Sequence, residues 1–163
     1  MTELPELINR VGYRPDCAVR PPTGLPHTSS GHQLPPDVKA FYLRCGGVDL
    51  WGQSDYAIRI LKPEEVLEAN PVIVGEQFPD DISSSWYTIA QTIDGDYITI
   101  DFAIERLGRC YDSYYENHGI VGSCRILATS FTSLFRMLVE LDGGRFSWLE
   151  PDFHSFGDAY DTI

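Results

Sequence analysis

Three carboxylates close together in the sequence are the first candidates for chemistry. Asp94, Asp96 and Asp101 could bind a metal ion, or two of them could act as general acid and base, because paired carboxylates serve both purposes. A hairpin explains them more simply, since Asp94-Gly95 is a strong signal for a tight turn. Asp96 and Asp101 then lie five residues apart on a strand, and alternation places them on opposite faces. We therefore predict turn and strand residues here rather than a catalytic pair or a metal site.

The cysteines and histidines show no spacing typical of a reactive or metal-binding site. The cysteines at positions 17, 45, 110 and 124 include no CxxC pair, and no local motif of a cysteine nucleophile surrounds them. Zinc could bind these cysteines together with histidines that are distant in the sequence, but the close ligand pairs typical of a zinc site are absent. The histidines are His27, His32, His118 and His154. The Gly-Gly steps end helical patterns, so neither opens a phosphate-binding loop. We expect buried free thiols, no cofactor and no catalytic residue.

The net charge of the chain limits the classes of molecule that it could bind. The chain carries 12 basic and 24 acidic side chains, a net charge of −12. Residues 1–62 have a net charge of +1, and the remainder has −13. Such a surface repels a polyphosphate backbone and an anionic membrane, so we expect neither nucleic-acid nor membrane binding. It would attract a basic protein. The alternative is that the acidity only keeps the protein soluble and monomeric.

The sequence Tyr-Asp-Ser-Tyr-Tyr-Glu at 111–116 is the best candidate for protein recognition. If it is a strand, Asp112, Tyr114 and Glu116 share one face, which then combines carboxylates with an amphipathic ring. Tyrosine is enriched at protein interfaces, and the neighbouring carboxylates could meet Lys or Arg. An ordinary half-buried strand with a solvated face is the alternative. With the acidic loop beside Pro79 and the hairpin carboxylates, the candidate partner-binding residues are Asp80, Asp81, Asp94, Asp96, Asp112, Tyr114 and Glu116.

Periodicity and turn residues predict the elements that position these side chains. The expected helices span residues 3–11, 34–45, 62–70 and 131–141, the last capped by Thr129 or Ser130. The expected strands span residues 56–61, 86–91, 97–101 and 109–115, with an Asp-Gly hairpin between the second and third. Residues 125–128 lead into the last helix.

Length and organisation predict one domain. A chain of 163 residues buries one sizeable core. We divide it into an N-terminal helix with a Pro-rich arm (1–33), a core (34–141), and an aromatic C-terminal tail that packs on the core (142–163). No stretch approaches the ~20 apolar residues that a membrane-spanning helix needs. The acidic N-terminus does not resemble a secretory signal, so we expect a cytoplasmic protein.

The order and spacing of several motifs resemble the SUKH superfamily (Smi/Knr-like proteins). The resemblance covers about residues 34–141 and rests on the following motifs: the Leu34-Pro35-Pro36 helix ending at Gly46-Gly47, Leu61-Lys62-Pro63-Glu64-Glu65, the Ile89-Ala90 strand with its Gly95-Asp96 hairpin and Asp101, the Gly108 strand, and the Ala128-Thr129-Ser130-Phe131 helix. Cys45 departs from the pattern, because the family often has a polar residue there. The resemblance implies an α+β fold with a mixed or mostly antiparallel sheet flanked by helices.

The same resemblance implies a function by binding, because the superfamily includes a fungal glucan-synthesis regulator and bacterial immunity proteins of toxin systems. We expect a non-enzymatic protein that neutralises a basic toxin domain, such as a nuclease, by steric and electrostatic occlusion. The alternative is a regulatory scaffold in cell-wall or stress signalling. An enzyme that uses the carboxylates is the least favoured hypothesis.

Overall fold

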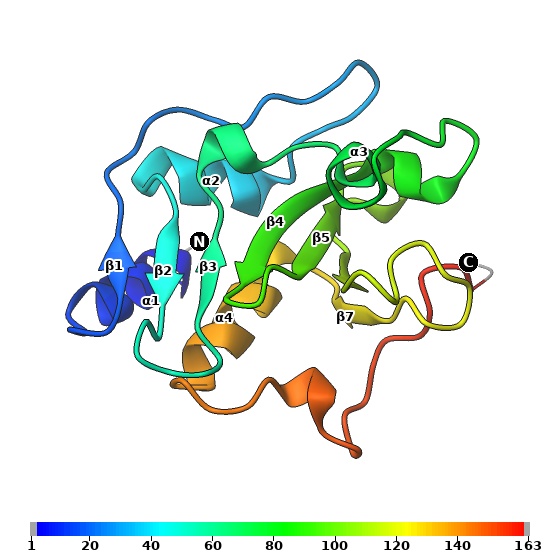
Figure 1. Cartoon of the computed structure of the whole chain (residues 1–163). Coiled ribbons are helices and arrows are strands. Elements are labelled where there is room, and N and C mark those ends of the chain that lie inside the picture. The colour runs from blue at the N-terminus through cyan, green and yellow to red at the C-terminus, as the bar shows by residue number, and fades with distance from the viewer. Residues whose placement is uncertain (1–2, 162–163) are drawn as a thin grey trace.

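One antiparallel sheet of seven strands organises the chain in a computed structural model that describes residues 3–161 (Figure 1). Each strand pairs with the next along the sequence, so the sheet is a continuous meander. Its strands are β1 (Ala18–Val19), β2 (Val48–Leu50), β3 (Ile58–Ile60), β4 (Trp86–Thr92), β5 (Tyr97–Asp101), β6 (Cys110–Ser113) and β7 (Ile126–Ala128). The predicted α+β fold, with a mostly antiparallel sheet flanked by helices, is confirmed.

Three amphipathic helices pack together behind the sheet and form the main core with it. They are α1 (Glu3–Gly12), α2 (Pro36–Arg44) and α4 (Phe131–Glu140), and Figure 1 shows α4 crossing behind the strands. The Ser130 side chain accepts a hydrogen bond from the Ser133 amide at the start of α4, which satisfies one of the free N–H groups of the first turn. Phe41 of α2 makes edge-to-face contacts with Phe131 and Phe135 of α4.

A second, smaller core lies on the opposite face of the sheet. There α3 (Ala69–Val74) and the chain between β6 and β7 cover part of β4 to β6. The Trp86 ring stacks on Tyr111 at 4.2 Å between centroids. The buried members of this cluster are Ala69, Trp86, Tyr111, Cys124, Ile126 and Ala159. Strand β6 is therefore buried on both faces.

Residues 62–70 differ from the single helix predicted for them. Pro63–Glu65 form one 3₁₀ turn, the chain then becomes extended, and α3 begins only at Ala69. The Leu67 carbonyl accepts from the Thr88 amide at 2.9 Å, and the Leu67 amide donates to the Thr88 hydroxyl at 3.1 Å. These contacts hold the segment along β4, so tertiary hydrogen bonds override local helix propensity. Further 3₁₀ turns span Ile82–Ser85, Ile104–Arg106 and Ser147–Leu149.

Both end segments contact the body of the protein. The Pro-rich segment contributes β1, and its Gln33 amide donates to the Phe102 carbonyl at 2.9 Å. In the last part of the chain, Trp148 is buried in the main core, and the Ile126 amide donates to the Gly157 carbonyl along the outer edge of β7. Cys45, Cys110 and Cys124 are buried free thiols, as expected, whereas Cys17 is half-buried. Within residues 3–161 no helix is long and apolar enough to cross a membrane.

Candidate protein-binding surface

Four of the predicted binding residues lie together at one end of the sheet. Asp94 is exposed in the β4–β5 turn, and Asp96 beside it accepts a hydrogen bond from the Tyr115 amide at 3.1 Å. Glu116 follows as an exposed residue. Burial is the main cause that raises the pKa of Tyr114 to about 12, and the nearby carboxylates, Asp96 and Asp94 among them, raise it further. We call Asp94, Asp96, Tyr114 and Glu116 the hairpin patch.

Within the described part of the chain, the carboxylates of the hairpin patch have no ion-pair partner. Asp94, Asp96 and Glu116 form no ion pair with any residue in the described range 3–161. Most arginines, in contrast, pair with carboxylates elsewhere, for example Arg14 with Asp142 and Arg136 with Glu3. The negative charge is therefore left available at this end of the molecule.

Asp112 lies inside the protein rather than on this surface. Its side chain is 2% exposed and accepts hydrogen bonds from Arg125 at 3.2 Å and from Asn117 at 3.1 Å. Alternation along the sequence predicted that Asp112 would lie on a solvated face of the strand. Strand register instead places Asp112 opposite Ile98, on the face of β6 that packs in the main core, where its carboxylate holds Arg125 and Asn117 of the β6–β7 loop in place.

Asp80 and Asp81 lie apart from the hairpin patch, in the loop between α3 and the Ile82–Ser85 turn. Asp80 is exposed. Asp81 is half-buried and accepts from the Ser83 amide at 3.0 Å and from the Tyr160 hydroxyl at 2.8 Å. Burial alone would raise the pKa of Asp81, but hydrogen bonds, of which the one from the Ser83 hydroxyl is the strongest, lower it overall, so the carboxylate stays charged at neutral pH.

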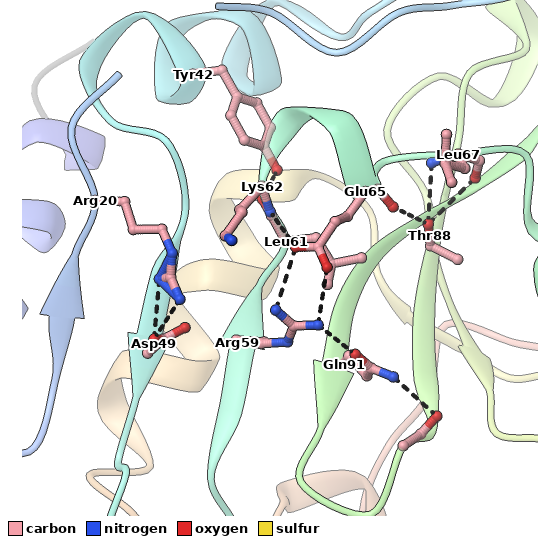
Figure 2. A network of polar contacts seen from close by, with 11 residues as sticks. Arg20, Tyr42, Asp49, Arg59, Leu61, Lys62, Glu65, Leu67, Thr88 and Gln91 are labelled. Carbon is pink, nitrogen blue, oxygen red and sulfur yellow. Dashed lines mark hydrogen bonds and ion pairs between the residues drawn. The ribbon is translucent and has the colours of Figure 1, made fainter. Parts of the chain in front are cut away.

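A groove of about 410 Å³ lies on the open part of the sheet, over β2 to β4. Strand register places Asp49, Arg59 and Gln91 directly opposite one another, hence on one face. Figure 2 shows the resulting network, in which the Arg59 guanidinium donates to Glu65 at 3.1 Å and to Gln91 at 2.8 Å. Arg20 reaches Asp49 at 2.8 Å. Ile93 and Gly95 also line the groove, so it extends to the hairpin patch.

Sequence reasoning missed this groove. Its polar side chains come from segments far apart in the chain and carry no shared motif. Only a local signal in the sequence could have indicated the polar side chains of the groove. Asp49 stands between two aliphatic residues that are buried, and Arg59 does so in its own strand. That pattern predicts an outward side chain, but the neighbours of each could come only from the strand order.

The structure contains two polar clusters that resemble catalytic arrangements. His118 lies between Ser113, at 2.9 Å from Nδ1, and Asn70, at 2.7 Å from Nε2. Ser113 is fully buried and also contacts the Thr99 hydroxyl at 2.7 Å, so no substrate reaches it. Asp101 is equally buried, and its carboxylate accepts from four groups: the Ser85 hydroxyl, the Ala103 amide, the Arg106 guanidinium and the Tyr111 hydroxyl. Both clusters satisfy buried polar groups. Among residues 3–161 no group of three or more His, Cys, Asp or Glu side chains is placed to hold a metal ion.

Known proteins similar to this chain agree with the motif pattern. The chain matches the SMI1 / KNR4 family (SUKH-1) over residues 28–137. It is 45% identical over 157 residues to the immunity protein YokJ of Bacillus subtilis (strain 168), which covers 96% of this chain and 95% of that protein. No solved structure matches the chain significantly. With a family match across more than half its length and a relative similar almost end to end, the chain belongs to the SMI1 / KNR4 family (SUKH-1).

Proposed function

We propose that this protein is an immunity protein that neutralises a toxin protein by binding to it, without catalysis, in the cytoplasm. The observation that carries the proposal is the 45% identity to an immunity protein across nearly the full length of both chains. The aligned region spans 96% of this chain, so the similarity is not confined to a single segment. The regulatory alternative has no comparable support.

The hairpin patch supports a basic toxin surface as the target. Its carboxylates are exposed or half-buried and have no cation within the described chain. Facing a basic surface, they speed association by long-range attraction. Tyr114 and the exposed Tyr115 beside them supply the amphipathic rings that are enriched at interfaces. If the target is a nuclease, the carboxylates stand in for phosphates and block its cleft.

The test begins with a pull-down from the native host at low and at high salt, followed by purification of the retained protein and co-expression with this chain. A toxin that is retained at low salt, and whose growth arrest the chain relieves, supports the proposal. A retained protein without toxicity points to the regulatory role. Failure of the chain to relieve the arrest caused by the retained toxin rejects immunity.

Charge reversal then tests the occluding surface. Asp94→Lys with Glu116→Lys should weaken toxin binding at least about tenfold and reduce its salt dependence. The matched control is Glu6→Lys with Glu140→Lys, two exposed residues on α1 and α4 that change the net charge equally. Equal weakening by both pairs would mean that only net charge matters and that the hairpin patch is not the binding surface.

A further inference from the structure

An apolar pocket of about 340 Å³ lies between α3 and the loop that joins β6 to β7. Val74, Phe78 and Ile120 line it, and these residues remain 41%, 43% and 51% exposed. Val121, next along the loop, is 73% exposed. Isolated exposed apolar residues are common, but a group around one hollow marks a binding surface.

The floor of the pocket has no free polar group. It includes Asn70, Ser83 and His118, which are all buried. His118 uses both ring nitrogens, on Asn70 and on Ser113, and the Asn70 amide donates to Gln77 at 2.7 Å and to Ser83 at 2.9 Å. A group that enters the pocket therefore gains apolar contact and no hydrogen bond from these side chains. The chemistry favours an apolar side chain on a rigid, preformed floor.

The rim of the pocket is acidic. Asp81 lines the pocket and stays ionised, and Glu76 and Asp80 are exposed in the same loop. Glu76 and Asp80 form no ion pair within residues 3–161, and no Lys or Arg lines the pocket. An apolar group flanked by basic residues complements this surface, whereas one flanked by acidic residues would be repelled.

We propose that the pocket receives an apolar side chain from a basic segment of the toxin and anchors the complex there. The inference rests on the proposed immunity function and adds a second contact to it. The β6–β7 loop carries Glu116 of the hairpin patch and Ile120 of the pocket, so one partner can reach both. The pocket supplies a desolvated anchor, and the carboxylates around it supply steering.

The decisive variants are Ile120→Ser and Phe78→Ser, each measured for toxin affinity at low and at high salt. Leu43→Ser is the control, because Leu43 is an apolar residue on α2 that is more exposed, at 63%, and does not line the pocket. Each pocket variant should weaken binding at least about tenfold at both salt concentrations, mainly through faster dissociation, and Leu43→Ser should stay within about twofold. Ile120→Leu should restore binding, and unchanged thermal melting shows that each variant folds.

Two results would overturn the inference. In the first, both pocket variants bind the toxin with wild-type affinity while the hairpin charge reversal weakens binding. This result would show that the pocket does not contribute to toxin binding, and it would leave the proposed immunity function intact. The neutral dye Nile red tests the pocket without any toxin, since its fluorescence with the wild-type protein should fall in Ile120→Ser but not in Leu43→Ser. Equal fluorescence in all three proteins would show that the pocket does not accept an apolar group, even if the protein binds its toxin.

Discussion

His118 Nε2 lies 2.7 Å from Asn70 Oδ1, and this contact joins the β6–β7 loop to α3 across 48 residues of sequence. Asn70 donates through its nitrogen to Gln77 and Ser83, so its oxygen is the acceptor and His118 carries its proton on Nε2. Nδ1 then accepts from the Ser113 hydroxyl. The neutral ring thus holds together the two segments that form the apolar pocket.

This arrangement predicts a loss of stability in acid. Burial lowers the pKa of His118 from 6.5 to about 4, so the unfolded chain binds this proton more readily than the folded one. The contribution of His118 to stability is complete above pH 6.5 and is lost as the pH falls toward 4. The loss amounts to about 3 kcal/mol. The free energy of unfolding of His118→Gln, measured by urea denaturation across this range, should depend less steeply on pH than that of the wild type. Parallel curves would contradict the prediction.

Asp112 is predicted to matter for stability and not for toxin affinity. Removing its carboxylate in Asp112→Ala leaves Arg125, whose side chain is 35% exposed, without its ion-pair partner. Because water still reaches that guanidinium, we expect a loss of about 2 kcal/mol in the free energy of unfolding. Asp94→Ala, an exposed control, should change it by less than about 0.5 kcal/mol. A folded Asp112→Ala protein with tenfold weaker toxin binding would place Asp112 in the interface after all.

Gly47 is predicted to tolerate no side chain. It has φ of +114°, and a Cβ there would lie 2.8 Å from the Ile60 carbonyl oxygen. Gly75 also has a positive φ, +89°, but has nothing within 4 Å of the same position. Gly75→Ala should therefore cost about 1 kcal/mol, from the backbone alone, and Gly47→Ala should cost more than about 2 kcal/mol. Equal losses in chemical denaturation would mean that β3 shifts to make room.

The Arg59–Glu65 pair in the groove is predicted to contribute little to stability. Both side chains are about one-third exposed, which screens their attraction. A double-mutant cycle with Arg59→Ala and Glu65→Ala should give a coupling of less than about 1 kcal/mol, and salt should reduce it. A coupling that is larger and independent of salt would show that the groove is effectively shielded from water.

Local sequence patterns correctly predicted the helices and strands whose apolar residues recur with a single period. The apolar stripe at Val38, Phe41 and Tyr42 packs as expected in α2, and Asp94-Gly95 forms the expected β4–β5 turn. These patterns depend on neighbours three or four residues away in a helix and two away in a strand. The same local reasoning missed β1 and β2, which are too short to show a period, and misread the segment that Thr88 holds along β4.

The sequence by itself determined the family, the α+β class and the excess of negative charge, because each depends on residue types and their order. Only the tertiary structure decided which carboxylates remain available. Asp94 and Glu116 are exposed, whereas Asp112 is buried against Arg125 on the face of β6 that packs in the main core, opposite Ile98. The apolar pocket has the same origin, since Phe78 and Ile120 meet only when distant segments pack together. Burial is a property of such long-range packing, and local periodicity cannot report it.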